Sequence, residues 1–142
     1  MGCAMVENYT ISLTSQGKGD VIDLSGDLKG VVQKTNIRNG QIYLFVIGST
    51  GGLTTIEYEP GLIRDIKEFF DGIIPYGLPY HHHDTWHDDN GSSHLQASLL
   101  KPNLNIPLQE GELVLGQWQQ VVFIDFDTRP RQRTLHCQVM GE

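Results

Sequence analysis

Cysteine is scarce in this sequence: its 142 residues include only Cys3 and Cys137. So few thiols favour a reducing compartment over a disulfide-stabilised, secreted fold. The sequence also lacks an apolar run approaching the roughly 20 residues that a membrane-spanning helix needs. Its first residues have neither the basic region nor the long apolar region of a signal peptide. We therefore expect a cytoplasmic protein with no membrane partner.

Positive charge is also scarce, with 10 Lys and Arg residues against 17 Asp and Glu residues and a formal net charge of −7. This balance argues against a nucleic-acid partner, because nucleic-acid binding through a broad basic face needs many cations. A small phosphorylated substrate needs only a few local cations, so that class of partner is compatible with the composition.

Hydrophobic residues make up 39% of the chain and charged residues 19%, which is typical of a folded domain. The length fits a single domain over residues 1–142. Helical periodicity is clear only over residues 60–70. Ser93 and Gln96 resemble a capping box that would begin a short helix over 94–100. The segment 21–34 is ambiguous, and its later half could form a third short helix. Alternating patterns predict strands over residues 9–13, 41–47, 53–58, 104–108, 112–115, 118–126 and 133–140. The sequence therefore predicts an α+β fold: a single β-rich domain with a largely antiparallel sheet and two or three short helices.

Histidine is concentrated in one segment, since residues 80–94 contain five of the six histidines. Neutral imidazole is a common metal ligand, and three imidazoles with an open fourth position are typical of catalytic zinc. The spacing of His83, His87 and His94 would let a loop fold around an ion. His81 and His82 are expected to be bystanders, because three adjacent side chains rarely converge on one ion. A solvated polar loop without metal is the alternative.

Two further segments carry polar groups suited to catalysis or anion binding. Glu57 and Glu59 alternate with Tyr58, so they share one face of a strand; they could be a general base and a metal ligand, or charges at a helix terminus. The turn Gly48–Gly52 offers the hydroxyls of Ser49 and Thr50 and free amides to a phosphate, although such a sequence is more often only a turn.

Arginines alternate near the end of the chain at Arg129, Arg131 and Arg133. If this segment is extended, the three side chains share one face and could form a local anion site. Pairing with Asp125 and Asp127 on the neighbouring strand is the equally good alternative.

Several segments together resemble the YjbQ-like family, and the match covers essentially the whole chain. They are Gly-Ser-Thr-Gly-Gly-Leu-Thr-Thr-Ile-Glu-Tyr-Glu-Pro-Gly-Leu (48–62), Asp-Asp-Asn-Gly-Ser-Ser-His-Leu-Gln-Ala-Ser-Leu-Leu (88–100), Gly-Gln-Trp-Gln-Gln (116–120), Arg-Pro-Arg-Gln-Arg (129–133) and the closing Gly-Glu (141–142). Many bacterial members have His-Thr-Ser-Ala where this chain has Gly-Ser-Thr-Gly at 48–51, so a histidine of the family is missing at this corner.

The resemblance implies a β-rich α+β fold that assembles as a homotrimer, with metal and phosphate-type anions bound near subunit boundaries. It also implies thiamine-phosphate synthase activity, in which hydroxymethylpyrimidine pyrophosphate and thiazole phosphate are joined and pyrophosphate is released. Residue by residue, it implies His83 and His94 as metal ligands with His87 a third, Glu57 as the acidic residue, and Arg131 and Arg133 as the basic pair.

The leading hypothesis is therefore a metal-dependent transferase acting on a phosphorylated small molecule. A divalent metal, zinc or magnesium, would be held by His83, His87 and His94, with Glu57 and Arg131 catalytic. A metal-dependent phosphate-ester hydrolase and a non-enzymatic binding module for metal or a small ligand are the alternatives. The residues expected to bind substrate are Ser49, Thr50, Asn90, Ser92, Ser93 and Arg133.

Overall fold

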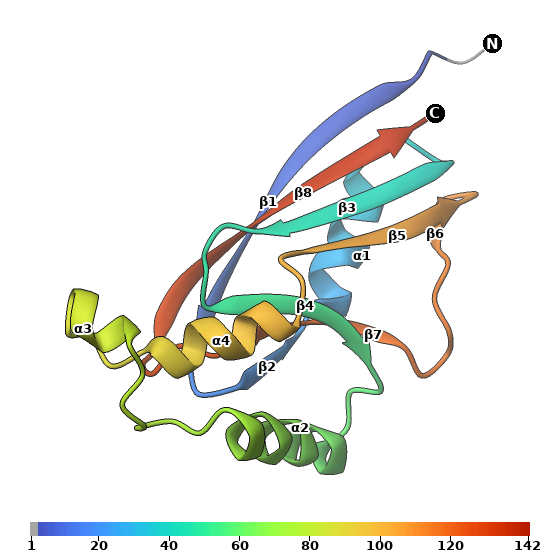
Figure 1. Ribbon diagram of the computed structural model, residues 1–142. Helices are drawn as coiled ribbons and strands as arrows, with labels where there is room; N and C mark the ends of the chain where they lie inside the picture. The colour runs from blue at the N-terminus through green and yellow to red at the C-terminus, as the bar shows by residue number, and fades with distance from the viewer. Residues whose placement is uncertain (1–2) are drawn as a thin grey trace.

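The computed structural model describes residues 3–142 and contains two antiparallel sheets with helices packed on them (Figure 1). The larger sheet has five strands in the order β1-β8-β3-β5-β6, and the smaller has three in the order β2-β7-β4. All strand pairs are antiparallel. The strands are β1 (Met5–Ser15), β2 (Asp20–Asp23), β3 (Gly40–Val46), β4 (Gly51–Ile56), β5 (Asn103–Gln109), β6 (Glu112–Leu113), β7 (Gln120–Asp125) and β8 (Arg131–Gly141). The α+β prediction is confirmed.

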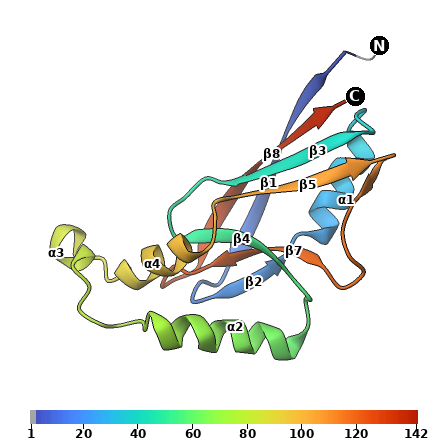
Figure 2. The same ribbon diagram turned by 45° about the vertical axis from the view of Figure 1, so that its right-hand side comes forward.

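Helices α1 (Ser25–Lys34) and α2 (Pro60–Ile73) flank the smaller sheet on opposite sides (Figure 2). Strand β7 explains this layering, because it is buried on both faces. Val121 and Phe123 join the core shared with the larger sheet and α1, whereas Val122 and Ile124 join a second core. Period-two alternation sends neighbouring side chains to opposite faces, so one apolar strand supports both cores.

Helix α2 confirms the predicted helix over 60–70 and extends it to Ile73. Pro60 occupies the first turn, where its missing N–H costs nothing, and the Glu59 carboxylate accepts hydrogen bonds from the backbone N–H groups of Gly61 and Leu62. Glu59 is thus a helix cap, which is one of the two roles predicted for it. Phe70 packs into the second core against Phe126, with ring centroids 4.7 Å apart.

The predicted start of the last helix is wrong. Helix α4 spans Gly91–Leu99, so Ser93 lies inside its first turn and is fully buried rather than capping it. Gln96 does not reach back to the helix start either: its amide nitrogen donates to the backbone carbonyls of Phe70 and Ile74 on α2. The capping-box pattern fails because a tertiary partner on another helix competes for the glutamine. A further short helix, α3 (His82–Trp86), makes four in residues 3–142, where two or three are predicted.

No helix in residues 3–142 combines the length and the apolar character needed to cross a bilayer.

Candidate functional site

The candidate site lies where α3 and the first turn of α4 meet the loop between β3 and β4. Gly91 begins α4 in close contact with the segment before α3. A Cβ atom added at Gly91 would lie 2.6 Å from the Cβ of Tyr80 and 3.1 Å from that of His82. Glycine therefore allows the start of α4 to approach the histidine segment, which brings His94 to His82.

His82 and His94 form the central pair of the site, with ring centroids 4.4 Å apart and an interplanar angle of 56°. The Nε2 atom of His82 lies 3.5 Å from Oδ1 of Asp88. Buried Asn90 completes this group: with its amide nitrogen turned toward them, it donates to Nε2 of His82 at 3.1 Å and to the Asp88 carboxylate at 3.0 and 3.2 Å. The sequence reasoning set His82 aside, and the structure gives it the more central position.

The three predicted metal ligands do not converge. His83 and His87 stack edge to face with ring centroids 5.5 Å apart, and both are exposed. Their pairing follows from α3, because successive residues in a helix differ by about 100° in direction while residues four apart share a face. His83 consequently faces His87, whereas His82 faces His94. Within the part of the chain that the structure describes, no group of three or more His, Cys, Asp or Glu side chains is placed to hold a metal ion.

His94 is half-buried, and this burial lowers its pKa from the ordinary value. The neighbouring His82 lowers the pKa further, since a second positive charge would be repelled. The carboxylates of Asp88 and Asp127 and the backbone of Ser49 favour the charged form without cancelling the shift. The imidazole of His94 is therefore neutral near pH 7 and able to accept a proton.

Two cavities open on either side of His94. One, of about 410 Å³, is lined by Gly48 and Ser49 together with apolar residues of β3 and α4. The other, of about 590 Å³, is lined by Tyr80, His82 and Leu95. Volumes of this size suit small-molecule ligands. His94 is the polar group common to both cavities.

Two of the three predicted arginines, Arg131 and Arg133, are tied to the buried aspartates, which is the second of the two alternatives. Arg133 donates through Nε and Nη2 to the two carboxylate oxygens of Asp125 at 2.7 and 2.8 Å, and Asp125 is fully buried. Arg131 donates through Nε to Asp127 at 2.9 Å, and its side chain is 35% exposed. Hydrogen bonding to Asp125 raises the pKa of Arg133.

The two hydroxyls predicted to bind an anion differ: that of Thr50 is already hydrogen-bonded, whereas Ser49 faces a cavity. Thr50 is buried; its hydroxyl accepts from Nη2 of Arg133 at 2.6 Å and donates to Asp127 at 3.2 Å. Ser49 instead lines the first cavity. At the adjacent Gly48, a Cβ atom would lie 3.3 Å from Nη1 of Arg133, so the guanidinium lies beside this glycine but is not part of the cavity lining. The sequence motif located this turn but did not show which hydroxyl is engaged and which is open.

Ser92 and Ser93 lie in the first turn of α4 beneath His94 and are 1% and 0% exposed. Within residues 3–142, neither hydroxyl has a hydrogen-bond partner. A buried polar group without a partner is costly and is one mark of a functional site. The positive end of the helix dipole lies at the same turn.

Glu57 is separated from these groups within one chain. It follows the last residue of β4 and is exposed, whereas Ser49 and Thr50 precede the first. At about 3.3 Å per residue, the strand places the two ends roughly 20 Å apart. A strand runs straight through the core, so proximity in sequence does not bring Glu57 to the site.

Comparison with known proteins gives a consistent family. A family model described as "UPF0047 protein YjbQ-like" matches residues 9–142. A UPF0047 protein of Archaeoglobus fulgidus is 33% identical over 87% of this chain and 93% of its own length. One from Methanothermobacter thermautotrophicus is 32% identical over 100% of this chain and 99% of its own.

Solved structures agree with the sequence comparisons. A "YbjQ-like protein of unknown function" from Sulfolobus solfataricus superposes with a TM-score of 0.91 at 27% identity, covering 99% of this chain and 100% of that one. A hypothetical protein from Aeropyrum pernix gives 0.89 at 28% identity, covering 96% and 99%.

These findings overturn the predicted identity as a thiamine-phosphate synthase, a transferase with a zinc centre. The relatives are named only as UPF0047 proteins, and the Sulfolobus structure is described as having unknown function. The zinc centre fails on geometry, because residues 3–142 provide no cluster of three suitable ligands. What the match over residues 9–142 establishes is that the chain belongs to the YjbQ-like UPF0047 family.

Proposed function

We propose that this protein is an enzyme that binds a phosphorylated small molecule beside His94 and hydrolyses its phosphate ester. One observation carries the proposal: a neutral, half-buried histidine stands between two ligand-sized cavities. The serine hydroxyls that line one cavity, with the Arg133 guanidinium close by, suit a phosphate, and the apolar residues of the other suit the organic part of a substrate.

The phosphate would lie over Gly48 and Ser49, beside the Arg133 guanidinium, whose Nη1 would be 3.3 Å from a Cβ atom at Gly48. The two contacts to Asp125 hold Arg133 in place and use its Nε and Nη2, which leaves Nη1 for an anion. Arg131 has a partly exposed guanidinium that could add a second contact.

His94 would act as the general base. Its neutral imidazole accepts a proton from a water molecule that attacks phosphorus, and the bond between phosphorus and the ester oxygen breaks. The protonated imidazole then returns the proton to the departing alkoxide, so that an alcohol and inorganic phosphate leave. Asp88 and Asn90 would hold His82, whose ring packs against His94, fixes its orientation and limits its charge.

The proposed reaction does not require the predicted divalent metal, and its effect on the rate is left to measurement. The donor set in residues 3–142 does not fit a resident metal held by three protein ligands. No step of the proposed reaction is therefore routed through a metal. Dependence on magnesium carried by the substrate stays a prediction, tested by comparing rates with added magnesium and with a chelator.

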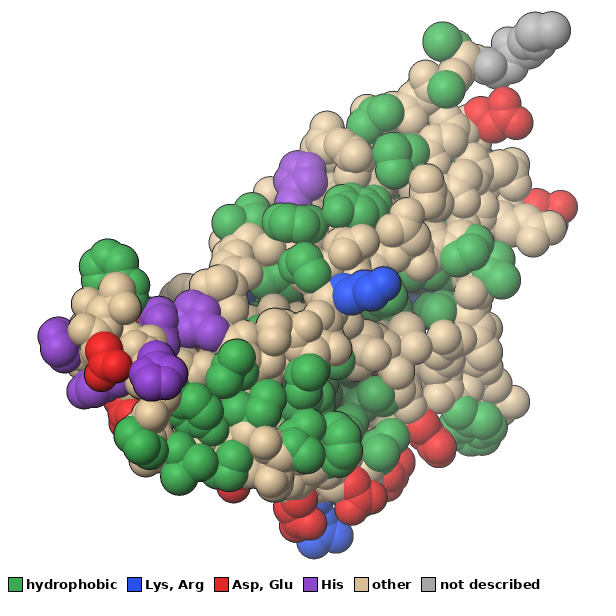
Figure 3. All heavy atoms as spheres, viewed as in Figure 1, with side chains coloured by type: hydrophobic (Ala, Val, Ile, Leu, Met, Phe, Trp, Pro, Cys, Tyr) green, Lys and Arg blue, Asp and Glu red, His purple; other side chains and the backbone are tan. Residues whose placement is uncertain are grey.

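A homotrimer is part of the same proposal. Figure 3 shows hydrophobic side chains gathered over α2 and α4, next to the histidines. Contiguous apolar surface of this kind marks interaction sites. A neighbouring copy covering it would close the second cavity and could bring its own Glu57 to His94. Light scattering on the purified protein should give three times the chain mass of 15.9 kDa. The exposed hydrophobic residues of this surface are Phe69, Ile73, Leu95 and Leu99, which are 46% to 60% exposed.

A cytoplasmic location is also proposed, supported by the two free cysteines, Cys3 exposed and Cys137 buried. Fractionation of cells expressing the protein tests this.

The experiment is a screen of phosphate monoesters for release of inorganic phosphate by purified protein. His94→Gln should lower kcat/KM by about 100-fold or more, the usual contribution of general acid–base catalysis. His83→Gln is the matched control, because His83 belongs to the same segment but is exposed and lines neither cavity. Equal loss in both variants would exclude His94 as the base.

A non-catalytic binding module is the second candidate. The contacts of the arginines favour it. Arg131 and Arg133 donate to buried aspartates, so few of their N–H groups are left to stabilise negative charge in a transition state. Calorimetry separates the two: binding of phosphate esters without phosphate release supports the module. The absence of both binding and turnover would refute the site.

A further inference from the structure

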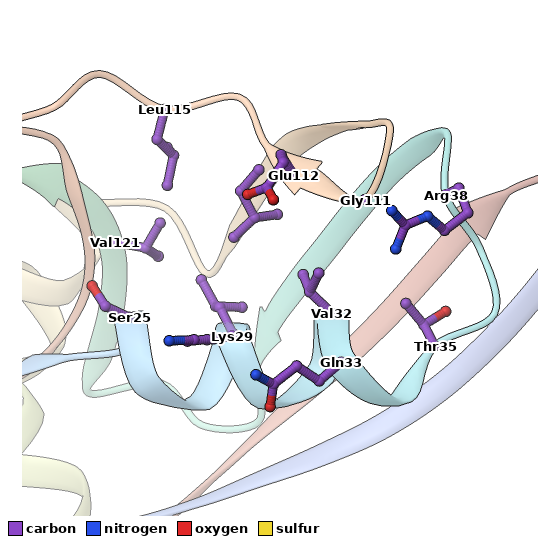
Figure 4. Close-up of a pocket in the computed structure, with 12 residues that line it drawn as sticks. Ser25, Lys29, Val32, Gln33, Thr35, Arg38, Gly111, Glu112, Leu115 and Val121 are labelled. Atoms are coloured by element: carbon purple, nitrogen blue, oxygen red, sulfur yellow. The ribbon is translucent and has the colours of Figure 1, made fainter.

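A third cavity, of about 440 Å³, lies apart from the histidine site and shares no lining residue with it. It opens between helix α1 and the segment from β6 to the start of β7 (Figure 4). Neither the sequence motifs nor the proposed function uses it.

The body of this cavity is apolar. Leu28 and Val32, one turn apart on α1, line the cavity together with Leu113 and Leu115. Figure 4 shows Val32 and Leu115 facing it from opposite sides. Val121 of β7, which is 1% exposed, forms the inner wall. Such a surface favours a hydrocarbon group over water.

The rim of the cavity carries Lys29 and Arg38, two of only 10 basic residues in a chain of net charge −7. Within residues 3–142, no carboxylate lies within 4.0 Å of either side chain. The two cations are therefore open to an anionic group of a ligand.

Arg38 is held in place rather than free in solvent. Its Nη2 donates to the backbone carbonyl of Glu110 at 2.8 Å. Gly111, with φ of +80°, leaves room for the guanidinium, because a Cβ atom there would lie 2.1 Å from its central carbon. One hydrogen bond orients the group, and its other N–H groups are available for a planar carboxylate.

Glu112 lies on the same rim, next to Leu113. Together with Lys29 and Arg38, this carboxylate leaves the rim with one positive charge in excess, which a single carboxylate on the ligand balances.

We propose that this cavity is a binding site for a small apolar monocarboxylate, with its carboxylate at Arg38 and its hydrocarbon part against Leu28, Val32 and Leu115. The proposal does not depend on the proposed hydrolase, because the two sites share no residue.

The test is a titration of the full-length protein with octanoate and with octanol, followed by backbone amide chemical shifts. Octanoate should shift the amides of α1 and of residues 111–121, and octanol should bind at least about fivefold more weakly, the size of a partly exposed ion pair. Equal affinity for octanol, or octanoate shifts confined to α2 and α4, would overturn the proposal.

Four variants sharpen the test. Arg38→Gln should weaken octanoate binding by about twofold to fivefold, and Lys29→Gln, at the other end of the cavity, should weaken it less. Lys34→Gln is the matched control: it removes the same charge from the last turn of α1, outside the cavity lining, and should leave the affinity unchanged. Leu115→Trp should fill the cavity and abolish binding. If that variant does not fold, the charge variants still decide, and an equal effect of Lys34→Gln would refute the assignment.

Discussion

Replacing Arg133 with methionine should destabilise the protein more than any other single loss of charge near the site. The guanidinium is 11% exposed and faces Asp125, which is fully buried, and Asp127, which is 3% exposed in its side chain. Methionine keeps much of the side-chain volume but leaves a buried carboxylate without its cation. Removing one partner of a buried ion pair typically costs about 3 to 5 kcal/mol.

The remaining contacts of Asp125 set where in this range the cost falls. Two charge-assisted hydrogen bonds from Arg133 disappear, at about 1.5 to 3 kcal/mol each. The hydroxyl of Ser15 and the backbone N–H of Asp127 still donate to Asp125, and these two hydrogen bonds partly stabilise its unpaired charge. We therefore expect a loss of about 4 kcal/mol in the free energy of unfolding.

Urea denaturation followed by fluorescence measures this loss, with the slope m expected to stay unchanged. Arg131→Met is the matched control, since Arg131 makes one bond to Asp127 and is 35% exposed; it should cost about 1 kcal/mol or less. The double change Asp125→Asn with Arg133→Met should recover part of the loss, because the charge of Asp125 is removed while Asp127 keeps its bond from Arg131. Equal losses in the two arginine variants, or a loss below about 1.5 kcal/mol in Arg133→Met, would refute the reasoning.

Three further predictions concern packing, protonation and reactivity. Gly91→Ala should lower the free energy of unfolding, measured by thermal denaturation, by about 1 to 3 kcal/mol, because its Cβ would meet that of Tyr80 at 2.6 Å. Gly72→Ala is the control: with nothing within 4 Å of the new Cβ, it should stabilise the protein by about 0.5 to 1 kcal/mol. Equal effects of the two changes would contradict this packing. The pKa of His94 is lowered in the folded state, so the unfolded chain binds the proton more readily and stability should fall as pH drops below about 6.5 and level off below the folded pKa. His94→Gln should flatten that part of the urea-midpoint profile, and an unchanged slope would count against the shift. Burial raises the pKa of the Cys137 thiol to about 11, so in a Cys3→Ser variant, which lacks the exposed thiol, Ellman's reagent should react only after unfolding. Rapid reaction of that variant in its native state would contradict the burial of Cys137.

The sequence predicted most of the fold because the patterns involved are local. Alternation located seven of the strands, with ends shifted by a few residues, and periodicity located α2. Strand β2 and helix α1 share the segment that the sequence left ambiguous, where Gly26 and Gly30 weaken the helical pattern. Contacts with both sheets stabilise α1 in spite of its glycines.

The candidate site was predicted in part. The histidine segment, the Gly48–Gly52 turn and the arginine segment do meet near one corner of the molecule. Their pairing differs from the expectation, because α3 turns His83 toward His87 and leaves His82 to face His94. Five neighbouring histidines mark a segment by composition alone, but only the direction of each side chain shows which of them meet.

What the sequence by itself determined is the α+β class, the antiparallel pairing, the family and the neighbourhood of the site. These follow from residue spacing, which acts over a few positions along the chain. The tertiary structure decided which histidines pair and which charges are satisfied. It placed Arg133 beside Thr50, 83 residues earlier, and fixed His94 between two cavities. Such contacts depend on the packing of α4 against the smaller sheet, and no local pattern specifies that packing.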